Sequence, residues 1–290
     1  MADGQFEESP RVAFQGELGA FSEEAVHRYF GEGVEAIPQR DFAEVGRSVV
    51  DGEVDYGLLP IENTLAGSVV GSYDVLGSGD LTILGEVITP IHHCVLGLPG
   101  AAVDRLERIL SHPVALMQCT RFLRSLPHVD AVVAYDTAGA AKDIADQSRP
   151  TQAAIAGRRA AARYGLEVLA ENVEDRPDNQ TRFLVVAASA DALPPRTRGT
   201  PPAGPMKSAL LIETANEPGT LLRILSPFAE RSINLSKLES RPAGEPWTYR
   251  FFMEFDEDAA APSATAALSE VATRAVKLQL LGTYPRWIDG

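Results

Sequence analysis

The feature that most constrains the fold is a repeated alternation of short apolar runs with helix-patterned segments. Val12–Phe14 and Asp55–Leu59 have the composition of buried strands, and between them Phe42, Val45 and Val49 recur at helical spacing. Strands that alternate with helices form a largely parallel sheet that helices cover. The sequence therefore predicts an α/β fold.

The alternation continues through two successive segments, which predicts two lobes. Residues 10–88 and 181–188 form the first expected lobe, and residues 89–180 form the second. Two lobes joined by two crossings leave a cleft between them, which is a common ligand site. Residues 189–206, rich in Pro, Gly and Thr, predict a linker, and the βαββαβ pattern of residues 207–287 predicts a ferredoxin-like module.

Charge and hydropathy exclude several partners. The net charge of -14 argues against nucleic acid and against an anionic membrane surface. The chain has no apolar run long enough to cross a bilayer, and Met1–Pro10 lacks the apolar segment of a secretory signal. Cys94 and Cys119 show no CxxC spacing, which fits a reducing compartment. We therefore expect a cytoplasmic protein.

The sequence predicts neither a metal site nor a cofactor. His92, His93 and Cys94 are consecutive in a predicted strand, where neighbouring side chains point to opposite faces and cannot converge on one ion. The chain also contains no Walker-type phosphate loop and no GxGxxG pattern, so nucleotide binding is unsupported.

The stretch Thr181-Arg182-Phe183 is the first candidate for chemistry. It stands where the polar loop 172–180 turns into an apolar strand, so a loop would present it at the mouth of a rigid sheet. It offers a hydroxyl, a guanidinium and an aromatic ring, which suit the expulsion of hydroxide from an anionic, ring-containing substrate. The alternative interpretation is a strand start whose Thr and Arg are merely solvated.

Further polar residues follow strand ends or begin helices. Each has a structural explanation when taken alone: Ser22 as a helix cap, Asn63 and Thr64 as turn formers, and Gln118 on a solvated helix face. Together they would surround one cleft with neutral donors and helix N-termini, which suits a carboxylate ligand. The set is Ser22, Asn63, Thr64, Ser111, His112, Gln118, Thr181 and Arg182.

Five stretches in the same order resemble the prephenate dehydratase family along nearly the whole chain. They are Gly16–Ala25, Leu59–Thr64, Ser111–Cys119, Asp136–Ala141 and Asn179–Phe183. The last module resembles an ACT regulatory domain, in which Glu239-Ser240-Arg241-Pro242 matches the family's phenylalanine-binding signature. Gln15 and Ala20 resemble the form of the first loop found in plant arogenate dehydratases.

The resemblance implies an enzyme that converts prephenate to phenylpyruvate in L-phenylalanine biosynthesis, without a cofactor, in a catalytic domain over residues 10–188. For this reaction we expect Thr181 to assist the departing hydroxide, Arg182 to hold the substrate anion, and Phe183 with Phe21 to shield the ring carboxylate from water. The expected substrate-binding residues are Ser22, Asn63, Thr64, Ser111 and Gln118. An arogenate dehydratase is the alternative, and a non-enzymatic amino-acid-binding protein or sensor is a third possibility.

The resemblance also implies feedback inhibition by L-phenylalanine bound to the ACT module. Gly219 would let the chain pass close to a ligand, the following helix N-terminus would meet its carboxylate, and Leu210 and Leu221 would receive its ring. The full expected set is Leu210, Asn216, Gly219, Leu221, Glu239, Ser240, Arg241 and Pro242. Because the module leaves strand edges open, we expect a homodimer or a homotetramer.

Overall fold

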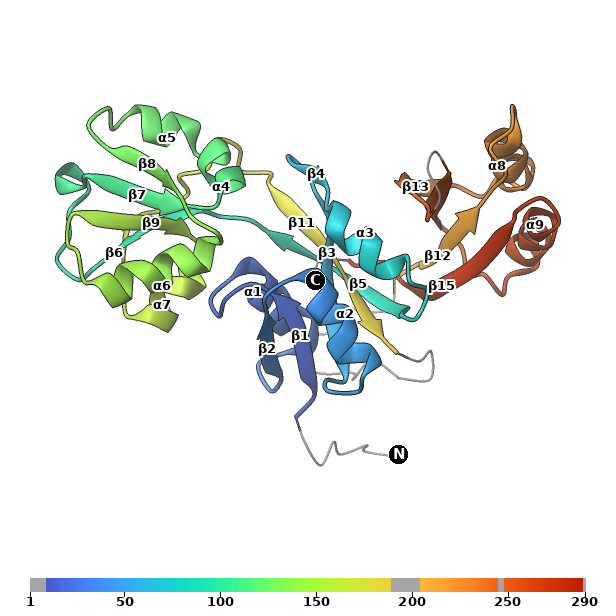
Figure 1. The fold of residues 1–290 in the computed structure, drawn as a ribbon, viewed down its shortest axis with the longest axis horizontal. Helices are drawn as coiled ribbons and strands as arrows, with labels where there is room; N and C mark the ends of the chain where they lie inside the picture. Colours follow the sequence, from blue (N-terminus) through green and yellow to red (C-terminus); the bar gives the residue numbers. More distant parts are fainter. Residues whose placement is uncertain (1–8, 189–203, 245–247, 289–290) are drawn as a thin grey trace.

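The computed structural model describes residues 9–188, 204–244 and 248–288 of the 290-residue chain. Its three parts lie in a row: lobe 2 at one end, lobe 1 in the middle and the ACT-like module at the other end (Figure 1). Most of the linker expected over residues 189–206 lies outside the described residues.

Lobe 1 is a sheet of order β2-β1-β3-β11-β5, with the short strand β4 paired to β3. Strand β11 enters from the end of lobe 2 and runs antiparallel between β3 and β5, whereas β1, β2 and β3 are parallel. The elements are β1 (Arg11–Gln15), α1 (Phe21–Phe30), β2 (Glu35–Gln39), α2 (Phe42–Val50), β3 (Tyr56–Asn63), β4 (Gly67–Ser68), α3 (Val70–Leu76), β5 (Thr82–Pro90) and β11 (Gln180–Ala187).

Lobe 2 repeats this plan with the order β8-β7-β9-β6-β10, in which β6 is the antiparallel strand that arrives from lobe 1. Its elements are β6 (Cys94–Gly97), the 3-10 helix η1 (Val103–Arg105), β7 (Arg108–Ser111), α4 (Pro113–Gln118), α5 (Thr120–Arg124), β8 (Asp130–Val133), α6 (Thr137–Gln147), β9 (Gln152–Ala156), α7 (Arg158–Tyr164) and β10 (Glu167–Ala170). The repeated order confirms the expected two-lobed α/β architecture, and this strand order is that of type II periplasmic binding proteins.

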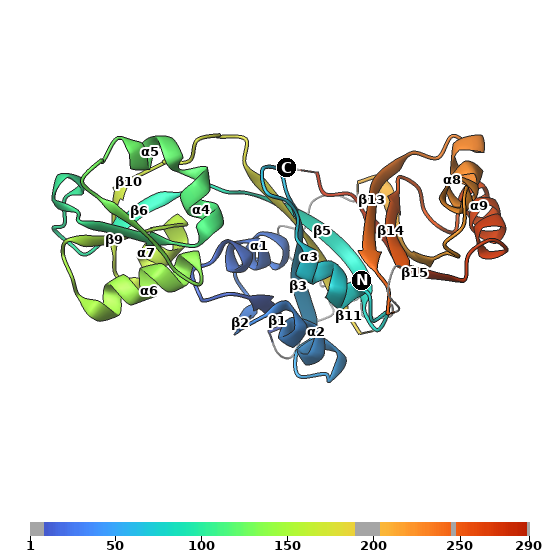
Figure 2. The same ribbon diagram turned by 45° about the horizontal axis from the view of Figure 1, so that its top comes forward.

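The last module is an antiparallel sheet of order β13-β14-β12-β15 with two helices packed on one face (Figure 2). Its elements are β12 (Met206–Glu213), α8 (Thr220–Glu230), β13 (Leu235–Pro242), β14 (Tyr249–Phe255), α9 (Pro262–Ala272) and β15 (Lys277–Pro285). The βαββαβ order confirms the ferredoxin-like class.

The two lobes share one hydrophobic core. Phe14 and Tyr29 of lobe 1 belong to the same buried cluster as Leu96, Ala138 and Ala160 of lobe 2. The loop after β1 also reaches lobe 2, where the hydroxyl of Tyr164 donates to the carbonyl of Leu18 at 2.7 Å. The lobes are therefore packed together on the α1 side.

The ACT-like module is also fused to lobe 1 through a common core. Ile83 and Leu184 of lobe 1 cluster with Leu211, Phe252 and Tyr284 of the module. At Gly282 a Cβ would lie 2.1 Å from the carbonyl oxygen of Ile83, so β15 passes too close to β5 for any side chain there. This packing fixes the module against the lobe that carries β11.

One local prediction is wrong. Ser22 does not cap α1, because the helix begins at Phe21 with Ala20 as its N-cap residue, so Ser22 is its second residue. In the described part of the chain, no helix has the length and apolar character needed to cross a membrane.

Candidate active site

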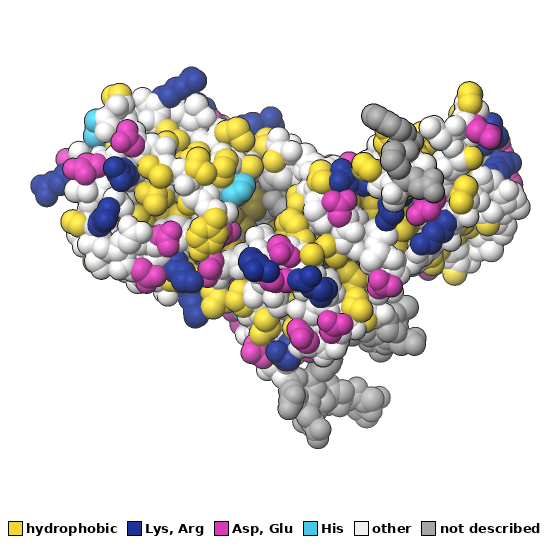
Figure 3. Space-filling view, in the orientation of Figure 1, with side chains coloured by type: hydrophobic (Ala, Val, Ile, Leu, Met, Phe, Trp, Pro, Cys, Tyr) yellow, Lys and Arg dark blue, Asp and Glu magenta, His cyan; other side chains and the backbone are white. Residues whose placement is uncertain are grey.

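A pocket of about 590 Å³ lies between the two lobes. In Figure 3 hydrophobic side chains gather on the face of lobe 2 that borders this hollow. Both lobes contribute to its wall, and β11 does so after crossing back into lobe 1. The lining side chains include Gln15, Phe21, Ser22, Arg40, Asn63, His93, His112, Gln118, Thr137, Thr181 and Phe183.

A second hollow, of about 550 Å³, lies between α2 and α3. Its polar rim holds four aspartates and a single arginine, Arg47. Such a rim would repel a carboxylate ligand. The interlobe pocket is therefore the better candidate for the site expected from the sequence.

Strand β11 sends its alternate side chains to opposite sides. Thr181 and Phe183 line the pocket, and Phe183 is only 2% exposed because its ring also belongs to the core shared by the two lobes. Arg182, between them, does not line the pocket. The period of two in a strand accounts for this separation.

Asn63 holds the hydroxyl of Thr181 in a defined orientation. The backbone N–H groups of Leu65 and Ala66 donate to Asn63 Oδ1 at 3.0 and 2.8 Å, which directs the Asn63 amide nitrogen toward β11. This nitrogen donates to Thr181 Oγ1 at 2.9 Å. An amide N–H can only donate, so Thr181 accepts here and keeps its own proton for a ligand.

The donor-to-acceptor direction set by Asn63 also fixes the hydrogen bonds of Gln118 and His93. Asn63 also donates to Asn179 Oδ1 at 2.9 Å, so the Asn179 amide nitrogen is free to donate to Gln118 Oε1 at 3.0 Å. Gln118 Oε1 lies 3.0 Å from His93 Nε2, which must then carry the proton of a neutral imidazole. Burial lowers the pKa of His93, so the ring stays neutral.

Gln118 therefore keeps its amide N–H groups for the pocket. Its oxygen is occupied by Asn179 and His93, whereas among the described residues its nitrogen makes only a 3.5 Å contact with Asn63 Oδ1. His112 offers a second neutral donor, because its Nδ1 accepts the backbone N–H of Val114 at 3.3 Å and the proton of the neutral ring is then on Nε2.

Positive potential reaches the pocket from helix ends and from one arginine. Phe21 and Ser22 are the first two residues of α1, and Thr137 is the first residue of α6; all three line the pocket. Helix N-termini present unpaired N–H groups and favour anions. Arg40, 79% exposed, stands at the rim and forms ion pairs with Glu44 and Asp41.

Two expected substrate-binding residues do not line this pocket. The hydroxyl of Ser111 is fully buried and donates to the carbonyl of Ile155 at 2.6 Å, which fastens β7 within its sheet. Thr64 accepts the backbone N–H of Gln180 at 3.0 Å and donates to the carbonyl of Asp178 at 3.3 Å. Each hydroxyl is used by backbone groups, so these positions contribute to the structure of the site and do not reach the ligand space.

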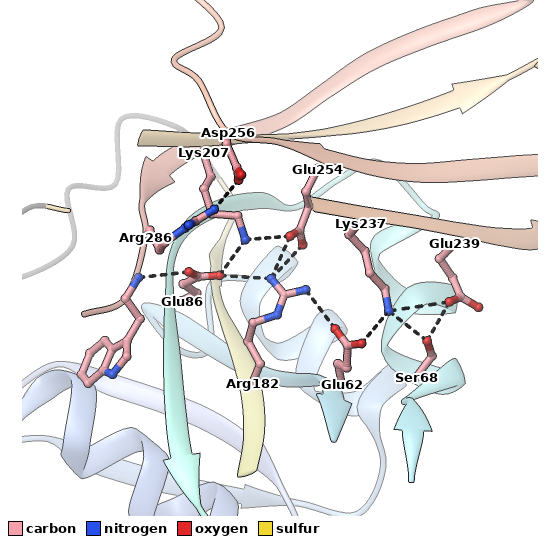
Figure 4. A network of polar contacts seen from close by, with 11 residues as sticks. Glu62, Ser68, Glu86, Arg182, Lys207, Lys237, Glu239, Glu254, Asp256 and Arg286 are labelled. Carbon is pink, nitrogen blue, oxygen red and sulfur yellow. Dashed lines mark hydrogen bonds and ion pairs between the residues drawn. The ribbon is translucent and has the colours of Figure 1, made fainter. Parts of the chain in front are cut away.

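The anion-holding role expected of Arg182 is contradicted by its direction. Its guanidinium lies on the face of β11 opposite the pocket, 3.0 Å from Glu86 and 2.9 Å from Glu254 of the ACT-like module (Figure 4). Burial would lower its pKa, but these carboxylates raise the pKa above its ordinary value. Arg182 is thus a fully paired cation at the junction of two domains.

The residues expected to bind phenylalanine are found in different environments. Leu210 is 1% exposed in the core of the ACT-like module, so it cannot receive a ligand's ring from the surface, and that prediction is wrong. Gly219 has the positive φ expected of a close turn before α8, and Asn216 and Ser240 are exposed. Glu239 instead contacts Ser68, and Arg241 contacts Asp74, both in lobe 1.

Several polar pocket residues are not among the site residues predicted from the sequence; they include Arg40, Asp41, Ser68, His93 and Thr137. The sequence raises His93 only as a possible metal ligand, although its position at the crossing into lobe 2 also indicates the cleft. Among the described residues, no group of three or more His, Cys, Asp or Glu side chains could hold a metal ion. Both cysteines are buried and free, and burial raises the pKa of Cys119 to about 12.

These features define a class of protein: a two-lobed α/β protein whose interlobe pocket carries hydroxyl, amide and helix-end donors for a small anion, with a ferredoxin-like module attached. The chain matches the family model described as prephenate dehydratase over residues 12–191 and that of the ACT domain over residues 208–273. The chain belongs to the prephenate dehydratase family and carries an ACT domain.

Curated relatives span nearly the whole chain. A bifunctional chorismate mutase/prephenate dehydratase of Stutzerimonas stutzeri is 38% identical over 282 residues, which cover 97% of this chain and 74% of that protein. Arogenate dehydratase 2 of Petunia hybrida is 40% identical over 290 residues, which cover 95% of this chain and 71% of that protein. The sequence similarity therefore includes dehydratases named for either substrate.

Two solved structures are similar over both domains. Prephenate dehydratase from Arthrobacter aurescens, in complex with L-Phe, has a TM-score of 0.86 and 32% identity, covering 95% of this chain and 90% of that one. GqqA, described as a novel type of quorum quenching acylase, has a TM-score of 0.84 and 34% identity, covering 96% of this chain and 98% of that one.

Replacing Gln118 by leucine tests the donor assignment. The change removes the free amide and leaves the donors of His93 and Asn179 without their acceptor, so we expect KM to rise about tenfold, with a smaller fall in kcat. Steady-state kinetics measure both constants, with Arg124→Gln on the exposed face of α5 as the control. An unchanged KM with a large loss of kcat would assign Gln118 to the chemical step.

Proposed function

We propose that the interlobe pocket catalyses the decarboxylative dehydration of prephenate to phenylpyruvate. The reaction removes the ring carboxylate as carbon dioxide and the ring hydroxyl, with one proton, as water, and the ring becomes aromatic. The observation that carries this proposal is the hydroxyl of Thr181, which lines the pocket and is held by Asn63 so that its proton remains available. Membership in the family supports the same reaction.

The difficult event is the departure of hydroxide, which is a poor leaving group. A donor placed against the leaving oxygen stabilises the charge that develops in the transition state. Thr181 can supply this hydrogen bond. A free threonine hydroxyl is too weak an acid to transfer its proton fully to the leaving hydroxide, so Thr181 stabilises the leaving oxygen by hydrogen bonding. His112 and Gln118, as neutral donors in the same pocket, would hold the remaining oxygens of the substrate.

The apolar wall favours loss of the ring carboxylate. Phe183 and Phe21 line the pocket, and the Phe21 ring meets the His93 ring edge-on at 5.4 Å between centroids. A carboxylate placed against such a wall loses solvation that its product, carbon dioxide, does not need. The pyruvyl carboxylate would instead lie toward the N-termini of α1 and α6 and toward Arg40.

Arogenate is the second candidate substrate, because it carries an ammonium group where prephenate carries a ketone. Asp41 lines the pocket beside Arg40 and could meet that ammonium, and similarity to Petunia hybrida arogenate dehydratase 2 also favours it. Purified full-length protein incubated with each compound decides between them: phenylpyruvate absorbance in alkali reports prephenate turnover, and released phenylalanine reports arogenate turnover. Turnover of neither substrate would refute the proposed function.

The geometry of the interlobe pocket does not support the acylase activity for which GqqA is named. An acylase that used Thr181 as nucleophile would need a base to accept its proton. Thr181 Oγ1 is instead hydrogen-bonded to the amide of Asn63, which has no proton-accepting capacity at its nitrogen. The same assay can include an N-acyl amide substrate to test this directly.

Regulation by L-phenylalanine, self-association and a cytoplasmic location complete the proposal. The phenylalanine-bound structure from Arthrobacter aurescens supports an effector role for the ACT domain. Strands β13 and β15 are the two edges of its sheet, and pairing of such edges between copies would give a dimer or a tetramer. Sedimentation with and without phenylalanine tests the assembly, and inhibition of the full chain tests the regulation.

A further inference from the structure

The ion pair Glu62–Arg182 lies directly behind the hydrogen-bonded pair Asn63–Thr181. In the register of β3 with β11, Asn63 is opposite Thr181 and Glu62 is opposite Arg182. Asn63 and Thr181 meet at 2.9 Å on the pocket face, and the Glu62 and Arg182 side chains meet at 3.6 Å on the opposite face. A shift of the rear pair along either strand therefore displaces the front pair.

The ACT domain holds each member of the rear pair separately (Figure 4). Lys237 of β13 contacts Glu62 at 3.1 Å, and Glu254 of β14 contacts Arg182 at 2.9 Å. Strand β3 is thus connected to β13, and strand β11 to β14, through one ion pair in each case.

The ion pairs around Arg182 are difficult to separate, because the four side chains are buried and their positive and negative charges balance. The exposed fractions are 14% for Arg182, 2% for Glu86, 8% for Glu254 and 6% for Lys207. Two cations and two carboxylates share this site, so withdrawal of one would leave an unpaired buried charge. Lys237 and Glu62, with Glu62 at 40% exposed, form the more easily changed contact at the edge.

Strand β13 also carries the segment expected to respond to phenylalanine. Lys237, Glu239 and Arg241 alternate on the face toward lobe 1, and Glu239 accepts the hydroxyl of Ser68 at 2.7 Å. Ser68 belongs to β4, which is paired to β3 and lines the pocket. A displacement of β13 therefore reaches both β3 and β4.

We propose that Glu62 and Arg182 are positioning residues through which the ACT domain sets the geometry of Asn63 and Thr181, with Lys237 as the contact that an effector changes. The inference rests on the proposed regulation by phenylalanine and gives it a route. It also gives the arginine of the Thr-Arg-Phe stretch a role that requires no contact with substrate.

Lys237→Met tests the route, because methionine keeps the length of the side chain and removes its charge. In the full-length chain we expect phenylalanine to bind with a Kd within about threefold of the parent, whereas the factor by which it inhibits falls at least about tenfold. Lys237→Arg should restore inhibition, and Lys277→Met, on the exposed start of β15, is the matched control. Calorimetry measures binding, and initial rates measure inhibition.

Hydrogen–deuterium exchange supplies a readout that does not depend on activity. In the parent, phenylalanine should change exchange in the ACT peptide covering 235–242 and in the pocket peptides covering 60–69 and 180–183. In Lys237→Met, the ACT peptide should still respond, whereas the pocket peptides should no longer do so. The proposed route from the ACT domain to the pocket is wrong if the pocket peptides of the parent do not respond to phenylalanine. It is also wrong if phenylalanine inhibits Lys237→Met as strongly as the parent. Neither result alone refutes regulation by phenylalanine. If the ACT peptide does not respond either, the proposed regulation fails together with the route.

Discussion

Thr181→Val is expected to lower kcat about a hundred- to a thousandfold while KM changes little, because one hydrogen bond to the developing hydroxide is lost. Valine has the shape of threonine, so Phe183 and the core behind it keep their packing. The Asn63 amide also keeps its acceptors on Asn179 and Gln180, so no buried donor is orphaned. The loss should therefore be confined to the chemical step.

Thr89 provides a matched control on the neighbouring strand. It pairs with Thr181 in the register of β5 with β11, is fully buried, and its hydroxyl has no hydrogen-bond partner in the described structure. Thr89→Val should leave kcat and stability close to those of the parent, since it removes an unsatisfied hydroxyl. Near-parental turnover in Thr181→Val would remove Thr181 as the donor and shift attention to His112.

Glu254→Leu is expected to lower the free energy of unfolding by about 3–5 kcal/mol, because in the described part of the chain it leaves Arg182 and Lys207 with Glu86 as their only buried carboxylate. Urea denaturation followed by circular dichroism measures this change. Because lobe 1 and the ACT domain share a core, the loss should appear in the main unfolding transition.

Two variants calibrate that result. Glu217→Leu removes a glutamate whose side chain is 70% exposed in the same domain, and it should cost less than about 0.5 kcal/mol. Adding Arg182→Leu to Glu254→Leu restores the charge balance between Lys207 and Glu86, so the double variant should regain part of the lost stability. Equal stability of parent and Glu254→Leu would show that the buried charges contribute nothing to the junction.

The same carboxylate predicts a dependence on pH. Burial alone would raise the pKa of Glu254, but Arg182 and Lys207 bring the pKa below its ordinary value. A depressed folded-state pKa stabilises the protein fully above the unfolded value of about 4.3, and this contribution is lost as pH falls through the folded pKa. The stability difference between parent and Glu254→Leu should therefore narrow below about pH 4. A difference that stays constant from pH 7 to pH 3 would contradict this assignment.

The sequence by itself determined the architecture, because the order of strands and helices is encoded in local hydrophobic patterns along the chain. Alternating strand and helix patterns predict two lobes and a ferredoxin-like module, and the structure has both. The period of two in a strand also separates Arg182 from Thr181 and Phe183, whatever the surroundings.

Only the tertiary structure decided what each face of β11 meets. One face borders the interlobe pocket, and the other is covered by the ACT domain through Glu254. Likewise, Ser111 and Leu210 look available in the sequence, but the carbonyl of Ile155 occupies the hydroxyl and two helices cover the leucine. The physical reason is that burial and hydrogen-bond partners come from segments far apart in the chain, and no local pattern specifies which of them will be in contact.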